Sequence, residues 1–190
     1  LNLLGKGIET DAGTRFMTRM LEHMQELTSR FQEETGSLYN LEATPAEGTS
    51  YRLAKIDKDL YAGIQAAGNG TPYYTNSTTL PVGMTEDVLF ALEHQDKLQP
   101  LYTGGTVFHT YLGEAVSDLN SLKNFIVKAF TNTKIPFLSI TPTFSVCGEH
   151  GYIAGEHFEC PTCGAESEVY TRVVGYSRTL QRWKTGKQGE

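Results

Sequence analysis

The chain has 190 residues, which is enough for one compact domain with a full hydrophobic core, alone or with a small appendage. Its formal net charge is -6 and no run of Lys or Arg stands out, so we expect no nucleic-acid partner. No stretch reaches the apolar length of a membrane helix and no signal peptide precedes the first expected helix, which excludes a membrane partner and favours a cytoplasmic protein. The chain starts at Leu1 and not at Met, so it can be a fragment of a longer polypeptide.

The first predicted element is a helix over residues 11–34, where large apolar residues recur at steps of three and four. Asp11 is its expected N-cap and Gly36 its expected stop. Residues 38–42 alternate loosely and predict a short strand, and residues 46–61, with Pro45 near the first turn, predict the next helix.

Short strands and helices continue to alternate along the chain. Thr85 is the expected cap of the next helix, with two acidic residues behind it in the first turn. Strands that alternate with helices imply right-handed crossovers, so the fold class is α/β with a parallel sheet or barrel. The predicted strands are 72–75, 105–112 and 135–141, and the predicted helices are 85–95 and 119–129.

Hydroxyl residues and a glycine gather at the junction between the strand over 38–42 and the helix over 46–61. Such a junction offers free backbone N–H groups and the positive end of a helix dipole, where phosphate binds. The alternative is a capped turn without a ligand, which the sequence alone favours. The similar loops 75–78 and 103–106 at strand ends could form walls of a pocket, but we favour structural turns, and we interpret His109 as a core or barrel residue. The candidate substrate-binding residues are Thr44, Ala46, Glu47, Gly48, Thr49 and Ser50.

In its last quarter the sequence becomes rich in Cys, His, Gly and Glu. Cys147-Gly-Glu-His150 and Cys160-Pro-Thr-Cys163 are two close pairs of soft ligands. Two such pairs can surround one tetrahedral ion, so the spacing predicts a zinc site in a reducing compartment. His157, three residues before Cys160, is an alternative fourth ligand, and either histidine could instead be a surface imidazole.

A site closed by four protein ligands has no open position for water or substrate, so we expect the zinc ion to be structural. It would occupy all three cysteines of the chain. No free thiol would then remain here for redox or nucleophilic chemistry.

The sequence from Arg172 to Tyr176, RVVGY, would on its own be a strand that ends in a glycine turn. It follows the two ligand pairs, however, and the chain ends with WKTGKQGE. Together with NLEATPAEGTSYRLAKIDK, PYYTNSTTLPV, LQPLYTGGTVFHTYLGE and TPTFSVC, it resembles the anaerobic (class III) ribonucleotide reductases, which are glycyl-radical enzymes. The resemblance covers the chain from about Leu38 to its end.

The resemblance implies a division of the chain into three parts. Residues 1–143 would be the later part of a ten-stranded α/β barrel, residues 144–168 a zinc-binding ribbon, and residues 169–190 the glycyl-radical loop and tail. The radical would be stored on Gly175, because a planar radical centre would be crowded by a Cβ atom and glycine has none.

The resemblance also implies the reduction of ribonucleoside triphosphates to deoxyribonucleotides without oxygen. A separate activase that uses S-adenosylmethionine and an iron–sulfur cluster would remove a hydrogen from Gly175. The radical would then pass to a cysteine outside this chain, because zinc holds the three cysteines present. That cysteine would lie on the N-terminal remainder of the reductase, in the same or a separate chain, and the full enzyme would be a homodimer.

Several alternatives stay open from sequence. The reductant could be formate or a thiol protein. The chain could be a spare glycyl-radical domain or part of another glycyl-radical enzyme. It could also be a zinc-ribbon module that binds a protein partner without catalysis.

Overall fold

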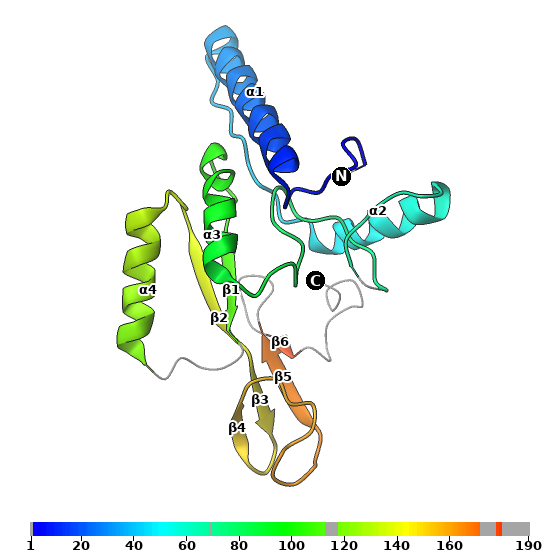
Figure 1. Ribbon diagram of the computed structural model, residues 1–190, viewed down its shortest axis with the longest axis vertical. Helices are drawn as coiled ribbons and strands as arrows, with labels where there is room; N and C mark the ends of the chain where they lie inside the picture. The colour runs from blue at the N-terminus through cyan, green and yellow to red at the C-terminus, as the bar shows by residue number, and fades with distance from the viewer. Residues whose placement is uncertain (1, 69, 113–117, 172–177, 180–190) are drawn as a thin grey trace.

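A computed structural model describes residues 2–68, 70–112, 118–171 and 178–179, and Figure 1 shows how its elements are arranged. The helices are α1 (Asp11–Thr35), α2 (Glu47–Leu60), α3 (Val88–Asp96) and α4 (Leu119–Asn132), with a short 3₁₀ helix, η1 (Gln99–Leu101). The strands are β1 (Phe108–Leu112), β2 (Leu138–Pro142), β3 (Phe144–Cys147), β4 (Gly151–Ala154), β5 (Ser167–Thr171) and β6 (Arg178–Thr179). Among these residues, no helix has both the length and the apolar character needed to cross a membrane.

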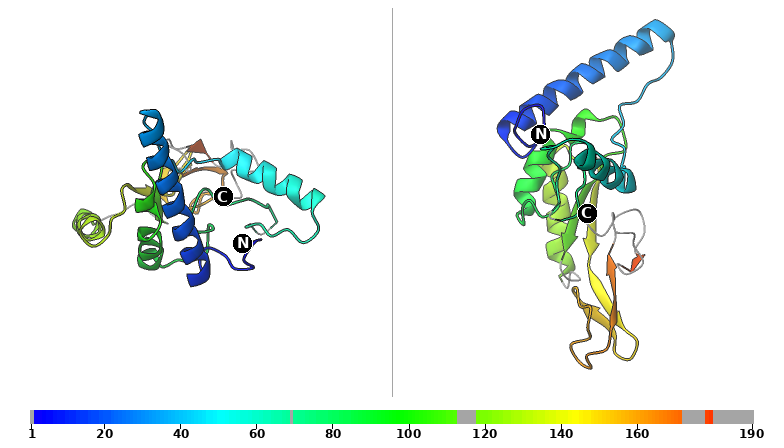
Figure 2. Two further views of the ribbon diagram at one scale, coloured as in Figure 1. Left: turned by 90° about the horizontal axis from the view of Figure 1, so that it is seen from above. Right: turned by 90° about the vertical axis from the view of Figure 1, so that its right-hand side faces the viewer.

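The helix α1 extends to one end of the molecule, and the sheet of β3, β4 and β5 lies at the opposite end (Figures 1 and 2). The predicted helix is confirmed, but its cap is Thr10 and not Asp11, because the Thr10 hydroxyl accepts the Gly13 N–H at 3.1 Å. Gly36 ends the helix as predicted, with a φ of 68° that favours glycine. Near its middle the helix buries Leu21 against Leu41 and Leu98.

The predicted strand over 38–42 is wrong as a ladder, since only Glu42 makes a bridge, parallel to Gly104. Beside that bridge, the Leu41 N–H donates to Thr103 Oγ1 at 2.7 Å. A Cβ atom on Gly105 would lie 2.4 Å from the Ala43 carbonyl oxygen, so the close approach of the two segments requires glycine there. The predicted strand over 72–75 is likewise reduced to one bridge, between Ala67 and Tyr73.

The helix α3 begins later than the sequence predicted. Thr85 is not its cap, because the Asp87 carboxylate accepts the N–H groups of Leu89 and Phe90 at 2.9 and 3.2 Å. Asp87 therefore lies at the N-cap and not in the first turn. Thr85 instead accepts the Asp87 N–H at 3.0 Å and holds the cap in place.

The strands β1 and β2 form a parallel pair, which confirms the predicted crossover through α4. Helices cover one face of the pair. On that face Phe108 of β1 is buried in one cluster with Leu92 of α3, Ala129 of α4 and Ile135. On the other face the His109 ring is exposed and stacks on Tyr111, with ring centroids 6.2 Å apart. The α/β class is thus confirmed, while His109 is not a core residue in this structure.

Buried polar contacts join distant segments to α3. His94 Nε2 lies 2.9 Å from the Ile8 carbonyl oxygen and 3.2 Å from Thr14 Oγ1. The next residue, Gln95, donates through Nε2 to the Thr78 carbonyl at 2.9 Å. These bonds satisfy polar groups that burial would otherwise leave unpaired, and they fix the 75–78 loop against the helix.

Thr143 connects the two sheets. It is the one residue between β2 and β3, and its N–H donates to the Leu112 carbonyl at 2.9 Å. Its own carbonyl accepts the Gly155 N–H at 3.3 Å, and its hydroxyl lies 3.4 Å from that of Thr171. The end of β1 and the second sheet therefore meet at a single residue.

A 2.7 Å hydrogen bond from the Tyr74 hydroxyl to Asp57 Oδ2 joins α2 to the following segment. Burial and this bond raise the pKa of Tyr74 to about 12. Because the folded-state pKa lies above the ordinary value, the stability it contributes is complete below about pH 10 and is lost as the pH rises toward about 12. We expect Tyr74→Phe to lower the free energy of unfolding by about 1 kcal/mol at neutral pH. Urea titrations should show this difference shrinking at alkaline pH, and a difference independent of pH would contradict the assignment.

Candidate metal centre and nucleotide loop

Four ligand atoms meet at the end of β3 that lies away from β2. The ligand atoms of Cys147, His150, Cys160 and Cys163 all lie within 4.8 Å of one another. Cys147 Sγ is 3.8 Å from Cys163 Sγ and 3.7 Å from His150 Nδ1, and that nitrogen is 3.8 Å from Cys160 Sγ. The structure therefore brings together the four residues that the sequence predicted as ligands.

These separations can be compared with those of a tetrahedral zinc site. Zinc–sulfur bonds of about 2.3 Å give sulfur–sulfur edges of about 3.8 Å, and edges to nitrogen that are slightly shorter. Three thiolates and one imidazole are a usual structural zinc set. The residues present therefore fit a single zinc ion, with His150 contributing Nδ1.

Two tight turns present the ligands. The first joins Cys147 to β4 and ends at Gly151, whose φ of 71° lies in the left-handed region. In the second, the Gly164 N–H donates to the Cys160 carbonyl at 2.8 Å, and the Cys160 N–H donates to the Ala165 carbonyl at 2.7 Å. Each pair of ligands is thus fixed locally, and pairing of β3 with β5 brings the two turns together.

Backbone N–H groups also shift the pKa values of the cysteine thiols. The N–H of His150, helped by that of the preceding residue, lowers the pKa of the Cys147 thiol. In the same way, the N–H of Cys163 and that of the residue before it lower the pKa of the Cys160 thiol. At Cys163 the Ala165 N–H acts in the same direction, but burial and the two neighbouring sulfurs outweigh it and raise that pKa. Two of the three sulfurs therefore favour the thiolate form that a metal requires.

His157, the alternative fourth ligand, is not in the cluster. Its backbone N–H donates to Ser145 Oγ at 2.8 Å, and that hydroxyl donates to the Gly155 carbonyl at 2.9 Å. The segment that carries His157 is thus tied to the middle of β3, whereas the cluster forms at the end of that strand.

The predicted nucleotide loop forms the N-terminus of α2. The Ala46 N–H is already used, because it donates to Asn76 Oδ1 at 2.8 Å. The N–H groups of Thr49 and Ser50 both donate to the Ala46 carbonyl, at 2.9 and 2.7 Å. Helix geometry then leaves the N–H groups of residues 47 and 48 for an external acceptor such as a phosphate oxygen.

The side chains of this loop divide into two groups. Thr44, Gly48 and Thr49 are exposed, and a Cβ atom on Gly48 would have nothing within 4 Å. Ser50 is only 5 % exposed, and its carbonyl accepts the Tyr74 N–H at 3.4 Å. The structure therefore places open space above the first turn, with Ser50 beneath it.

The 75–78 loop, predicted as a structural turn with a pocket wall as the alternative, supports the N-terminus of α2 through a contact that the sequence did not predict. Asn76 holds the N-cap residue of α2 although the two residues are 30 positions apart. The neighbouring Ser77 has a φ of 49°, a left-handed conformation that is uncommon for residues other than glycine. The run of turn-forming residues was the only sequence signal, and it could not reveal a contact over that distance.

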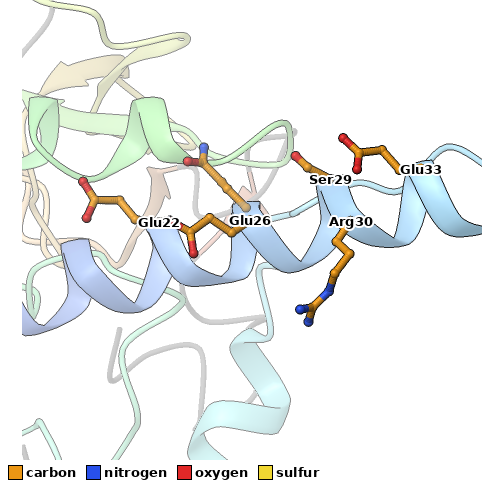
Figure 3. Close-up of a pocket in the computed structure, with 6 residues that line it drawn as sticks. Glu22, Glu26, Ser29, Arg30 and Glu33 are labelled. Carbon is orange, nitrogen blue, oxygen red and sulfur yellow. The ribbon is translucent and has the colours of Figure 1, made fainter.

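A groove on the flank of α1 is a poor substrate site (Figure 3). Its charged side chains are Glu22, Glu26, Arg30 and Glu33. Three carboxylates against one guanidinium would repel a triphosphate. None of the predicted site residues lines this groove.

Gly175, the predicted radical residue, lies outside the described residues. Its neighbourhood is defined at both ends, because Thr171 of β5 pairs with Arg178 of β6 and Tyr170 pairs with Thr179. In the sequence, the segment 172–177 therefore connects two paired strands, of which β6 is an edge strand of the sheet that carries the Cys₃His cluster.

A parallel β-pair backed by helices, continued by an antiparallel sheet whose Cys₃His cluster could hold a metal ion, defines an α/β protein with a small cysteine-containing ribbon. Residues 1–190 match the family model described as anaerobic ribonucleoside-triphosphate reductase, and the chain belongs to that family of enzymes. The resemblance seen in the sequence is thereby confirmed.

Named relatives agree with this assignment. The chain is 26 % identical to the anaerobic ribonucleoside-triphosphate reductase of Haemophilus influenzae over 182 residues, which are 90 % of this chain and 25 % of the relative. It is 29 % identical to the enzyme of enterobacteria phage T4 over 188 residues, 93 % of this chain and 29 % of the relative. The chain thus spans about a quarter of the length of these relatives.

Solved structures support the fold. The anaerobic ribonucleotide reductase of Thermotoga maritima, determined with MES in its active site, superposes with a TM-score of 0.69 at 24 % identity. The match covers 90 % of this chain and 28 % of that one. A structure of the same enzyme in complex with dATP and CTP gives the same TM-score at 23 % identity.

Proposed function

We propose that this chain is the C-terminal portion of an oxygen-sensitive glycyl-radical enzyme that reduces ribonucleoside triphosphates to deoxyribonucleoside triphosphates. The radical is stored on Gly175 and passes to a cysteine that is not in this chain. The observation that carries the proposal is the pairing of β5 with β6, the strands that flank residues 172–177, in a chain that belongs to the reductase family and has its Cys₃His cluster at the opposite end of the same sheet.

The metal cluster explains why the thiyl cysteine must come from elsewhere. Cys147, Cys160 and Cys163 are the only cysteines in the chain, and all three contribute to the cluster. A structural zinc ion would keep them as thiolates and crosslink β3 to the loop before β5. The reactive cysteine then belongs to the N-terminal remainder of the reductase, and residues 1–143 to the later part of its ten-stranded barrel.

The radical residue itself can be tested directly. When the full reductase is activated without oxygen by its S-adenosylmethionine-dependent iron–sulfur activase, we expect an electron paramagnetic resonance doublet. The splitting should come from the hydrogen that remains on Gly175 Cα, so it should collapse when the protein is grown with glycine deuterated at Cα. An activated protein without a doublet, or with one insensitive to this label, would refute the proposal.

The N-terminus of α2 is the proposed phosphate-binding element of the substrate site. The N–H groups of residues 47 and 48, which have no acceptor within the helix, and the helix dipole both favour an anion. The exposed hydroxyl groups of Thr44 and Thr49 add donors on the same loop. Support from a relative comes from the Thermotoga maritima enzyme, whose complex contains dATP and CTP.

Gly48→Ala separates this role from a structural one. The new Cβ atom meets nothing within 4 Å, so the free energy of unfolding should stay constant or rise by up to about 1 kcal/mol. The same methyl group would occupy the space where a phosphate approaches, so we expect the KM for the ribonucleotide to rise about tenfold. Steady-state kinetics and urea unfolding measure the two effects, with Ser29→Ala on α1 as a control. An unchanged KM would argue for a turn that binds no ligand.

A further inference from the structure

We infer that one face of the metal ribbon, formed by Tyr152, Phe144, Tyr170 and Glu168, is the docking surface for a basic protein, the activase that generates the radical. We call these four residues the aromatic face. The inference rests on the proposed function for the identity of the partner. The surface itself rests on the geometry and charge of the ribbon.

The aromatic face is a row of rings across three neighbouring strands. Phe144 of β3 lies in the middle, with its ring centroid 5.6 Å from that of Tyr152 on β4 and 5.3 Å from that of Tyr170 on β5. The outer ring, Tyr152, is 56 % exposed. Glu168 belongs to the same face, because its carboxylate accepts the Tyr170 hydroxyl at 2.7 Å.

The other face of the same sheet accounts for the folding of the ribbon. Alternate residues Ser145, Cys147, Ser167 and Val169 are at most 2 % exposed and lead to the metal ligands. The aromatic face does not share in that burial, since Tyr152 and Glu168 are exposed. A row of rings that is only partly buried, with acidic residues around it, is typical of surfaces that bind another protein.

The negative charge of the ribbon indicates a basic partner. Residues 143–171 contain five glutamates, all exposed, and neither Lys nor Arg; the glutamates are Glu149, Glu156, Glu159, Glu166 and Glu168. Such a surface repels a second copy of itself and attracts Lys and Arg side chains, which also stack well on aromatic rings. A basic protein surface therefore fits better than self-association.

The position of the aromatic face points to the activase in particular. Tyr170 is separated from the 172–177 segment by Thr171 alone, and it pairs with Thr179 on the far side of that segment. A protein that removes a hydrogen from Gly175 must approach this edge of the sheet. The row of rings leads from the outer strand β4 to that edge.

The test is the affinity of the zinc-loaded, full-length reductase for its activase, measured without oxygen at low and at physiological salt. We expect Tyr152→Ser and Glu168→Lys each to raise the Kd about tenfold, and Tyr152→Phe to restore most of the binding. Radical yield should fall when the activase is limiting and recover when it is saturating. Binding by the unaltered protein should weaken as salt is added.

Two controls match these changes away from the ribbon. Tyr61→Ser removes a ring that is 59 % exposed at the end of α2, and Glu26→Lys reverses a charge on the exposed flank of α1. Both should leave the Kd unchanged, and metal analysis should show that all variants retain zinc. Variants of the aromatic face that bind like the unaltered protein, or binding that ignores salt, would overturn the inference.

Two further outcomes are distinct. If the ribbon variants instead disrupt the reductase's own assembly in light scattering, the aromatic face is covered by the reductase and the inference is wrong. If the unaltered reductase binds the activase with the expected variant pattern but forms no radical, the proposed function fails while the docking surface stands.

Discussion

Cys160→Ser is expected to abolish metal binding and to unfold the ribbon of β3, β4 and β5. Binding of structural zinc contributes about 10–16 kcal/mol in zinc-finger peptides, which is as large as the whole stability of a typical domain. The ribbon has little else to replace it, because its buried apolar side chains are few and its strands are four or five residues long. Zinc analysis and hydrogen exchange of the amides in β3 and β5 would measure both effects.

A control for this substitution lies in the same turn. Thr162→Ala changes an exposed side chain between the two cysteines but keeps the backbone N–H groups that face the sulfur atoms. It should retain the metal and the protection of β3 and β5. If Cys160→Ser lost zinc and the amides of β3 and β5 stayed protected, the cluster would not be what holds the sheet together.

Gly175→Ala is expected to remove the radical and all deoxyribonucleotide production from the reconstituted enzyme. The added Cβ atom would crowd the planar radical centre that glycine alone leaves open on both sides. Zinc content should not change, since no metal ligand is altered. Electron paramagnetic resonance and a deoxynucleotide assay measure the two losses.

The control for Gly175→Ala is a substitution at the preceding residue. Val174→Ala shortens a side chain one position earlier and keeps the glycine, so the doublet should persist. Turnover by the Gly175→Ala enzyme at the rate of the unaltered enzyme would remove the basis of the proposed mechanism.

The metal site was predictable from the sequence because its information is local. Each pair of ligands lies within one turn, so the spacing Cys147–His150 and Cys160–Cys163 already specifies where the atoms point. The spacing also favours His150 over His157, because the gap from Cys147 to His150 equals the gap from Cys160 to Cys163. The antiparallel pairing of β3 with β4 agrees with this choice, since it places His150 in the turn between these strands.

Helix positions were predicted well and their caps less well. The apolar spacing located α1 and α4, and Pro45 indicated the start of α2, but the observed caps of α1 and α3 are Thr10 and Asp87 in place of the predicted Asp11 and Thr85. Short polar side chains at adjacent positions offer similar hydrogen bonds, and the backbone geometry decides between them.

The short strands before α2 and after it were not predictable in the same way. A strand depends on its neighbours, and within the described residues Glu42 and Tyr73 each find only one bridging partner. Asn76 shows the same limit for the nucleotide loop, because its contact with Ala46 joins segments that the sequence pattern cannot relate. The ten-stranded barrel remains a prediction for the longer reductase.

The single residue Thr143 has a practical consequence for the mechanics of the molecule. Thr143 bonds to Leu112 of β1 on one side and to Gly155 and Thr171 of the ribbon on the other, and it is the one residue between β2 and β3, so the ribbon follows the parallel strands without a linker at this point. A displacement of β1 or β2 would therefore also move the C-terminal end of β5, where Thr171 contacts Thr143. Cleavage of the polypeptide at Thr143, or insertion of another sequence there, would break this connection. Engineered variants should therefore keep residues 138–147 uninterrupted.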